Sequence, residues 1–205
     1  MTVHSQAHLA YLALERLIVT LKLPPGMLLT ERQLIELAGH GRTPVREAIQ
    51  KLAWQELMEV LPRVGLQITT IKPEDRLHLM QTRLMLEPLA AALVAEHADT
   101  DARRAMGECA AEMRQCASAD DLERFLVADK AFDELMEEAC PNRFLTASLA
   151  PLQTHARRIW FAGASVERMR GSVERHVAVI DAIMLADAEG AAAAMSSLMT
   201  YLAQD

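Results

Sequence analysis

The sequence predicts a mainly α-helical protein of 205 residues, built from two parts. Hydrophobic residues make up 51% of the chain and aromatic residues only 4%, which is typical of helices because strands favour β-branched and aromatic residues. Short β-prone runs occur only within residues 57–71, and from residue 74 onward every segment has helical periodicity. These observations predict a small domain over residues 1–72 and an all-helical domain over residues 73–205.

The small domain begins with a helix over residues 5–21, where leucine and isoleucine recur at helical spacing until a Pro-Pro-Gly breaker. A second helix follows Thr30, whose hydroxyl can cap it, and it ends at the Gly-His-Gly of residues 39–41. We predict that a third helix has Thr43 as its cap and Pro44 as its first residue, where the missing N–H costs nothing.

Two β-prone runs follow, LMEVL at residues 57–61 and LQITTI at residues 66–71. The intervening Pro62-Arg63-Val64-Gly65 predicts a hairpin with a glycine-containing turn. Three helices followed by a β-hairpin predict a winged helix-turn-helix, in which the hairpin is the wing.

The second domain is predicted to be an antiparallel bundle of six helices. The predicted ranges are 74–97, 100–117, 120–139, 142–161, 165–186 and 188–204. Pro88 lies inside the first of these helices and is expected to bend it.

The charge is divided unevenly between the two domains. Residues 1–72 hold eight Lys or Arg against six Asp or Glu, a net +2, whereas residues 73–205 hold 13 against 22, a net −9. Only the first domain is therefore suited to a polyanionic partner.

Localisation is predicted from what the sequence lacks. No stretch approaches the roughly 18 apolar residues of a membrane span, and the N-terminus has no signal-peptide pattern. The three cysteines, Cys109, Cys116 and Cys140, lack metal-like spacing and indicate reduced thiols. We expect a cytoplasmic protein with no membrane partner.

Arginines gather at the start of the third helix. In a helix-turn-helix this end enters the major groove, where Arg42, just before the predicted cap, and Arg46 can reach guanine edges or phosphates. The Thr43 hydroxyl and the first backbone N–H groups can contact a phosphate. Arg32 is placed to touch the flanking backbone, and Arg63 in the hairpin turn to reach the minor groove or phosphates. The alternative is that these are ordinary solvated arginines.

The stretch LPPGMLLTERQLIELAGHGRTPVREAIQKLAWQELMEVLPRVGLQIT resembles the DNA-binding domain of the GntR family of bacterial transcription regulators. The shared pattern is a Pro-Gly turn, an acidic residue opening the second helix, Arg-Thr-Pro-Val-Arg-Glu-Ala opening the third, and a glycine in the wing. The resemblance implies that Arg32, Arg42 and Arg46 contact an operator and that the wing around Gly65 enters the minor groove. One departure is Gly41, where the family usually has a serine or threonine able to bond a phosphate.

A candidate metal site lies in the second domain. Asp129 and Asp133 are spaced i and i+4 on one predicted helix, so their carboxylates share a face, and His176 lies on a later helix. Two carboxylates and an imidazole that converge inside a bundle can bind a divalent metal. The alternative is an acidic pair on a solvated face and a histidine held by hydrogen bonds.

Three blocks, RLMLEPLAAALVAEHA, DKAFDELMEEACPNRFL and ERHVAVIDAIMLADAEGAAAAM, resemble the effector domain of the FadR-type (FCD) subfamily, in a short VanR-like form. Many members hold a metal through one Asp and three His, with a carboxylate-bearing effector beside it. The resemblance matches Asp129 and His176 to two ligands, but Asp133 and Leu198 stand where histidines are expected. It implies either a zinc, nickel or manganese site on Asp129, Asp133 and His176, or a metal-free cavity that binds its effector with arginines.

Candidate effector contacts are Arg83, Asn142 and Arg158. Arg83 is four residues before Glu87, so it forms an intrahelical ion pair or, if it faces the cavity, the bidentate partner of a carboxylate. Arg158 belongs to the pair that opens RRIWF, and Asn142 matches a family asparagine or caps its helix.

The function expected from these features is a ligand-responsive transcriptional regulator and not an enzyme. We expect a homodimer that acts as a repressor on double-stranded operator DNA, with a small carboxylate-type effector bound in the helical domain. The alternatives are a metal-dependent enzyme or a protein-interaction adaptor built on the bundle.

Overall fold

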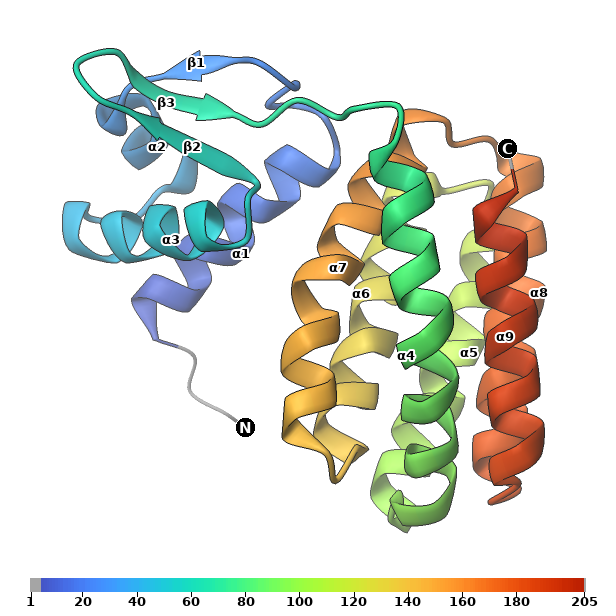
Figure 1. The fold of residues 1–205 in the computed structure, drawn as a ribbon. Helices are drawn as coiled ribbons and strands as arrows, with labels where there is room; N and C mark the ends of the chain where they lie inside the picture. The colour runs from blue at the N-terminus through green and yellow to red at the C-terminus, as the bar shows by residue number, and fades with distance from the viewer. Residues whose placement is uncertain (1–4, 205) are drawn as a thin grey trace. The chain divides into compact units, whose positions relative to one another are not determined.

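The computed structural model describes residues 5–204 and is mainly helical, with one small antiparallel sheet (Figure 1). The chain divides into two compact units, Met1–Pro73 and Glu74–Asp205. The predicted fold class, a winged helix-turn-helix followed by a six-helix bundle, is confirmed.

The first unit contains the helices α1 (Gln6–Val19), α2 (Glu31–Ala38) and α3 (Arg42–Trp54). α1 packs against both α2 and α3. The side chains that fill this core are fully or almost fully buried and are aliphatic: Leu14, Ile18, Leu34, Val45, Leu52, Leu57 and Ile68. The apolar stripes expected from the sequence therefore form one core, which holds α3 in place.

The sheet of the first unit has the order β1-β3-β2 and is antiparallel throughout. Its strands are β1 (Leu28–Leu29), β2 (Met58–Leu61) and β3 (Gly65–Ile68). β2 and β3 form the predicted hairpin. β1 was not predicted, because a two-residue strand is too short to show a period of two. It pairs with β3 and anchors the wing to the chain before α2.

The second unit contains the six helices α4 (Asp75–His97), α5 (Thr100–Ala119), α6 (Leu122–Ala139), α7 (Arg143–Ala162), α8 (Val166–Met184) and α9 (Ala188–Ala203). α4 and α9 come from opposite ends of this unit yet lie side by side, and α4 also packs against α7 (Figure 1). α5 packs against α6 and α8, which completes the bundle.

Five of the six bundle helices begin at a side chain that accepts a hydrogen bond from the backbone N–H three residues later. These caps are Asp99, Asp121, Asn142, Ser165 and Asp187. Such caps satisfy the N–H groups that a helix start leaves without partners, and they explain why the starts were predictable.

The helices α5 and α4 each contain a residue at which the sequence predicted a break or a bend. The predicted break at Ser118 is wrong: its hydroxyl donates to the carbonyl oxygen of Arg114 at 2.9 Å, and α5 continues to Ala119. The helix ends instead at Asp120, which has a left-handed φ of 56°. α4 runs through Pro88 as one helix, and the bend expected there stays a prediction.

The core of the bundle is rich in methionine and contains all three cysteines as free thiols. Burial, and secondarily the charge of Asp129, raises the pKa of Cys109 to about 12. None of the described helices is both long and apolar enough to span a membrane.

Candidate functional site

The start of α3 differs from the prediction by two residues. Arg42 is the first helical residue and Gly41 is the N-cap, so the prediction of Thr43 as the cap is wrong. The physical reason is that Arg42 already belongs to the helix, which places Thr43 one position inside it. Because glycine has no side chain, α3 has no side-chain cap. The positive end of the helix dipole therefore remains available for an anion.

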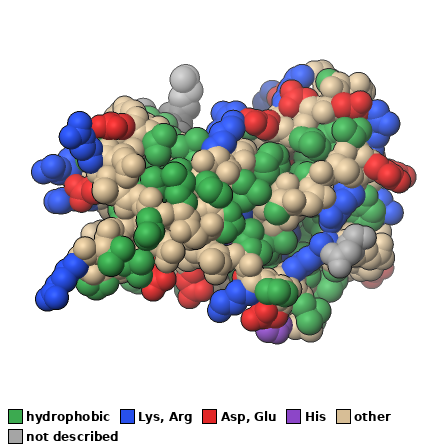
Figure 2. Space-filling model, turned by 90° about the horizontal axis from the view of Figure 1, so that it is seen from above, with side chains coloured by type: hydrophobic (Ala, Val, Ile, Leu, Met, Phe, Trp, Pro, Cys, Tyr) green, Lys and Arg blue, Asp and Glu red, His purple; other side chains and the backbone are tan. Residues whose placement is uncertain are grey.

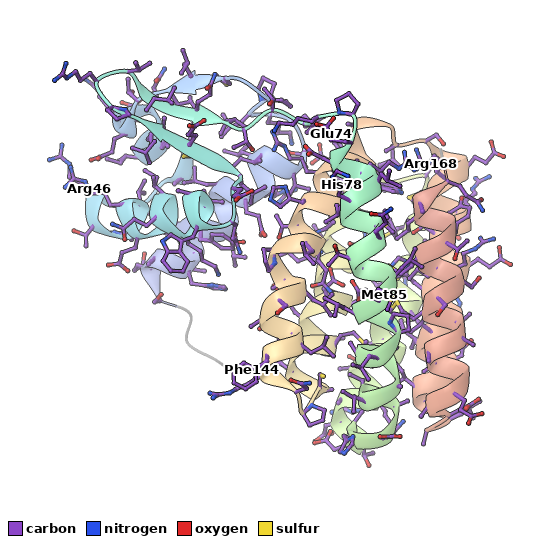
Figure 3. The ribbon with its side chains drawn as sticks, viewed as in Figure 1. Arg46, Glu74, His78, Met85, Phe144 and Arg168 are labelled. Atoms are coloured by element: carbon purple, nitrogen blue, oxygen red, sulfur yellow. The ribbon has the colours of Figure 1, made fainter. Side chains whose placement is uncertain are left out.

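Arg42 and Arg46 project from this end of α3, and their side chains are 72% and 59% exposed. Both contact Glu31, the first residue of α2, with Nε–Oε distances of 3.4 Å for Arg42 and 2.9 Å for Arg46. Figure 3 shows Arg46 pointing outward from α3. Exposed ion pairs of this kind contribute at most about 1 kcal/mol, so a phosphate can compete for either guanidinium.

Two further predicted contacts lie on the same unit. Arg32 is 88% exposed on α2 and pairs with Glu36 at 3.0 Å. Arg63 is exposed in the turn between β2 and β3, with a left-handed φ of 65°. In the space-filling view, basic side chains project from the surface of this unit, with acidic ones among them (Figure 2). The predicted DNA contacts are thus accessible to a ligand.

Gly65 has a structural role that the sequence did not show. Its φ is 138°, and a Cβ at this position would lie 2.7 Å from the carbonyl oxygen of Leu29. The close approach of β1 to β3 therefore requires glycine.

The second unit contains a pocket lined by residues of α4, α6, α7, α8 and α9. Its charged lining residues are Arg76, Arg83, Asp129, Asp133, Arg157 and Arg168. Its apolar lining includes Leu79, Met80, Phe125, Leu126, Ile159, Trp160 and Leu202. The pocket is partly open, and its volume is about 40 Å³. The pocket therefore combines several guanidinium groups with an apolar wall.

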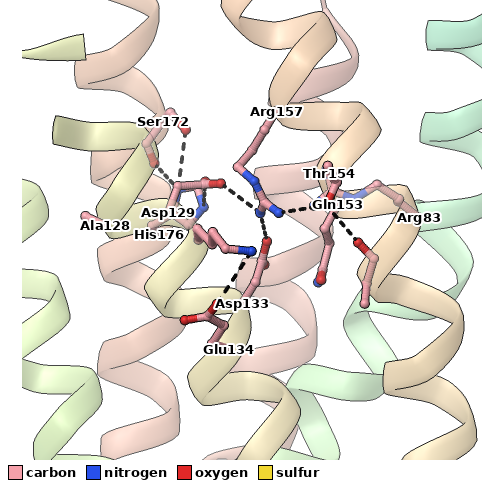
Figure 4. A network of polar contacts seen from close by, with 12 residues as sticks. Arg83, Ala128, Asp129, Asp133, Glu134, Gln153, Thr154, Arg157, Ser172 and His176 are labelled. Atoms are coloured by element: carbon pink, nitrogen blue, oxygen red, sulfur yellow. Dashed lines mark hydrogen bonds and ion pairs between the residues drawn. The ribbon is translucent and has the colours of Figure 1, made fainter. Parts of the chain in front are cut away.

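Arg157 of α7 lies between the two carboxylates that the sequence singled out (Figure 4). Its Nη1 donates a hydrogen bond to Oδ2 of Asp133 and lies 3.5 Å from Oδ2 of Asp129. Its Nη2 donates to the hydroxyl of Thr154 at 3.2 Å. Only 7% of the Arg157 side chain is exposed, against 16% for Asp129 and 13% for Asp133. The three side chains form a largely buried ion cluster.

His176 of α8 completes this cluster. Its Nε2 lies 3.2 Å from Oδ1 of Asp129, and its Nδ1 lies 2.9 Å from the carbonyl oxygen of Ser172. Both oxygens are acceptors, so both ring nitrogens find their best partners when each carries a proton. The geometry therefore favours the imidazolium form.

The pKa values of the cluster follow from burial and from these contacts. Burial alone would lower the pKa of His176, but the hydrogen bond to Asp129 and the charge of that carboxylate raise it overall. Burial alone would raise the pKa of Asp129, but the hydrogen bond from His176 and the charges of His176 and Arg157 lower it. For Asp133, burial outweighs the effect of Arg157, and with the nearby Asp129 it raises the pKa to about 7.

Arg83 has the intrahelical ion pair that its spacing allowed, and its role as an effector contact stays a prediction. It forms a buried ion pair with Glu87, with Nη2 and Oε1 2.8 Å apart, and it also lines the pocket. Gln153 donates a hydrogen bond to the same Glu87 oxygen at 3.3 Å. This arrangement holds the Arg83 guanidinium in place.

The other two candidate effector contacts are not among the lining residues of the pocket. The Asn142 side chain caps α7, accepting from the backbone N–H groups of Phe144 and Leu145 at 3.2 Å. Arg158 is buried, with 1% exposed, but its neighbour Arg157 lines the pocket instead. The helical phase of α7 explains this, since Gln153, Arg157 and Trp160 are spaced by three or four residues and share one face.

Comparison with known proteins shows the family to which both domains belong. Residues 6–68 match the family model "Bacterial regulatory proteins, gntR family", and residues 78–201 match the FCD domain. The chain belongs to the GntR family and carries an FCD domain. It is therefore a transcriptional regulator and not an enzyme.

Several proteins similar to this GntR-family regulator are also named as transcriptional regulators. It is 27% identical to the "Probable D-xylose utilization operon transcriptional repressor" of Paenarthrobacter nicotinovorans, over 82% of this chain and 74% of that protein. It is 27% identical to the "Uncharacterized HTH-type transcriptional regulator YieP" of Escherichia coli K12, over 95% of this chain and 94% of that protein.

Solved structures show the same fold. The E. coli protein McbR/YncC has a TM-score of 0.82 at 19% identity, covering 97% of this chain and 95% of its own. A GntR regulator from Rhodococcus sp. RHA1 has a TM-score of 0.73 at 18% identity, covering 96% of this chain and 95% of its own.

The metal implied by the FCD resemblance does not fit the side chains of this GntR-family chain. The space between Asp129 and Asp133 holds the guanidinium of Arg157, and Nε2 of His176 faces a carboxylate. Leu198, at the position of the last expected histidine, is 1% exposed in the apolar core. Within residues 5–204, no group of three or more His, Cys, Asp or Glu side chains is arranged to hold a metal ion.

Proposed function

We propose that this regulator binds an operator through α3 and the wing, and that a small organic anion bound in the bundle pocket changes its operator affinity. The observation that carries the proposal is the pocket itself, which Arg83 and Arg157 line together with apolar side chains inside the bundle. An organic acid has the matching chemistry, with an anionic head for a guanidinium and an apolar body for the wall.

The DNA contacts proposed for the first unit are Arg32, Arg42, Thr43, Arg46 and Arg63. Support comes from the exposure of the arginines and from the uncapped start of α3. Arginine can bond guanine bidentately in the major groove, and the α3 N-terminus can hold a phosphate. Glu31 orients Arg42 and Arg46 until DNA replaces it as their partner.

A homodimer on a near-palindromic operator is part of the proposal, because two copies related by a two-fold axis match two half-sites. We also propose repression as the default mode of action, in line with the repressor named among the relatives. The effector acts by linkage: it binds the DNA-competent and DNA-incompetent states unequally and shifts their populations.

Trp160 adds support for a ligand in the pocket. It lines the pocket, and its indole Nε1 is buried without a hydrogen-bond partner in the described part of the chain. A buried donor of this kind is normally satisfied by water or by a ligand. We propose that an effector oxygen accepts this hydrogen bond.

DNA binding is tested with fluorescence anisotropy on the DNA upstream of the protein's own gene and on oligonucleotides selected from a random pool. We expect Arg46→Ala to weaken specific binding about 10- to 100-fold, because it removes a contact to a base or a phosphate. The matched control is Arg170→Ala, since Arg170 is also exposed, at 58%, and also pairs with a surface carboxylate, Asp120, at 2.7 Å. If no DNA binds specifically at low salt, the operator proposal is refuted.

Effector binding is tested separately, by the melting temperature of the protein across a library of carboxylic acids. Ligands that bind only the folded state raise this temperature. We expect a subset of acids with apolar bodies to do so and to change operator affinity. A library with no stabilising member would refute the effector proposal and leave the DNA result unaffected.

A further inference from the structure

We infer that Arg157 supplies, from within the chain, the positive charge that a divalent metal would otherwise provide between Asp129 and Asp133. The pocket is therefore an arginine-based site that takes an organic anion without a metal. The role of Arg157 concerns only the chain's own residues, whereas the metal-free anion site rests on the proposed effector function.

Arg157 occupies the space between the two Oδ2 atoms where a shared metal would bind. A divalent ion bound to both carboxylates must lie about 2.0–2.6 Å from an oxygen of each. Nη1 of Arg157 lies at this meeting point, hydrogen-bonded to Oδ2 of Asp133 and 3.5 Å from Oδ2 of Asp129. A metal that bridges these two oxygens can enter only if the guanidinium leaves them.

His176 supports the same conclusion. A histidine binds a metal through the lone pair of an unprotonated ring nitrogen. Here Nδ1 faces the carbonyl oxygen of Ser172 at 2.9 Å, an arrangement that would suit a metal ligand, but Nε2 faces Oδ1 of Asp129 at 3.2 Å. When Nε2 carries a proton, its N–H donates to Asp129 and the nitrogen has no lone pair left to bind a metal.

Charge balance explains why an arginine belongs at this place. Two carboxylates, on successive turns of α6 and largely buried, repel each other unless a cation lies between them. The guanidinium meets this need with a single charge and directional N–H groups. A divalent ion added beside it would be repelled by a buried like charge.

The ligand class follows from what lines the remaining space. Arg83 stands on α4 and Arg157 on α7, and both line the same pocket as Phe125 and Trp160. A carboxylate bound between the two guanidinium groups would place its apolar body against these rings. The site therefore favours a monoanionic organic acid over a metal-chelating polyacid.

Measurements of metal binding test whether Arg157 takes the place of a metal. We would measure the metal content of the purified protein and titrate it calorimetrically with Zn²⁺, Ni²⁺ and Mn²⁺, comparing wild type, Arg157→Ala and Arg158→Ala. The control is closely matched, since Arg158 is the adjacent, buried arginine outside the pocket lining. We expect wild type and Arg158→Ala to lack a stoichiometric site, and Arg157→Ala to bind at least one of these metals about tenfold more tightly or better.

Two results would overturn this role of Arg157. One is a wild-type protein with one metal per chain that is lost in His176→Ala. The other is a folded Arg157→Ala protein whose metal affinity equals that of Arg158→Ala. Should Arg157→Ala fail to fold, Arg157→Lys replaces it: this variant keeps the charge and is expected to exclude metal as wild type does, and a metal gained by it would refute the inference.

The metal-free anion site is tested with acetate, butyrate and benzoate as probes. We expect the rise in melting temperature caused by a binding acid to be the same in EDTA as in buffer containing Zn²⁺, Ni²⁺ or Mn²⁺. A rise that needs the metal would overturn the metal-free site. If no acid in the wider library raises the melting temperature, the effector proposal fails, whereas the metal titrations still decide the role of Arg157.

Discussion

Asp129→Asn should change how the stability of the protein depends on pH. The substitution keeps the shape of the side chain but removes the carboxylate that faces His176 at 3.2 Å in a site where the two side chains are 16% and 5% exposed. Removing one partner of a buried ion pair costs about 3–5 kcal/mol of unfolding free energy. The loss should be largest at the pH values at which His176 is charged in the wild type, whether or not it is also charged in the variant.

The sign follows from the pKa shifts. In the wild type the pKa of His176 is raised above its ordinary value, so the stability gained from the pair is fully present below about pH 6.5 and is lost as pH rises through the raised pKa. Asp133 acts in the same direction, because its raised pKa of about 7 makes the folded state lose stability as pH rises toward 7. Wild-type stability should therefore fall between about pH 5.5 and 8.

In Asp129→Asn the same histidine is buried without its carboxylate. Burial then lowers the pKa of His176 below its ordinary value, so stability is lost as pH falls through about 6.5. The pKa of Asp133 also falls, because a neighbouring negative charge is gone. As pH rises, the difference in unfolding free energy between the two proteins should therefore become smaller. The total change should be about 1.4 kcal/mol for each unit by which the pKa of His176 differs between them.

Urea unfolding at half-unit steps between about pH 5.5 and 8 measures this difference, and NMR titration of the His176 ring measures the pKa in both proteins. This range avoids the acid region, where the lowered pKa of Asp129 and the surface carboxylates would add their own dependence. Parallel stability curves for the two proteins, or a His176 pKa unchanged by the substitution, would refute the proposed pairing.

Three further predictions concern single sites. Gly65→Ala should lower the unfolding free energy by about 1–3 kcal/mol, because its Cβ would lie 2.7 Å from a carbonyl oxygen at a φ of 138°. The control, Gly26→Ala, has a φ of 80° and open space around it, so it should cost less in the same urea experiment. Gly41→Ser should raise operator affinity in anisotropy measurements without loss of stability. A side chain there meets only Pro44, at 3.9 Å, and its hydroxyl adds a helix cap and a phosphate contact. Equal or weaker affinity would contradict this role. Cys109, with a pKa of about 12, should react with iodoacetamide at pH 8 far more slowly in the native protein than in urea, and equal rates measured by mass spectrometry would contradict its burial.

Most of the fold was predictable because its signals are local. Thr30 and Asn142 cap helices where the sequence placed helix starts, and β2 and β3 end close to the predicted hairpin turn. The features that were missed depend on the neighbouring chain. β1 exists only because β3 pairs with it, and the requirement for Gly65 comes from the carbonyl of Leu29, 36 positions earlier in the sequence.

The acidic residues and the histidine of the candidate site could be predicted from the sequence, but the arginine that compensates their charge could not. Asp129 and His176 were found because they match motif positions, and Asp133 because it lies one turn after Asp129. The structure brings Arg157 to them from another helix. Arg157 and Arg158 lie about 100° apart around the helix, so they face different directions, but the sequence does not say which of the two faces the site. The choice between them depends on which face of α7 meets α6, which is a property of packing.

Arg157 also gives the two departures from the family pattern a common physical explanation. A carboxylate at position 133 in place of a histidine adds a negative charge to the site, and the Arg157 guanidinium compensates it through a direct hydrogen bond. Once a guanidinium fills the space between the carboxylates, a histidine at position 198 would have no metal to bind and would be a buried polar group without a partner. Leucine, which is 1% exposed at that position, instead contributes apolar contact to the core. Asp133, Arg157 and Leu198 are therefore best understood as one coupled set, so that restoring a histidine at position 133 or 198 alone should not restore a metal site while Arg157 remains.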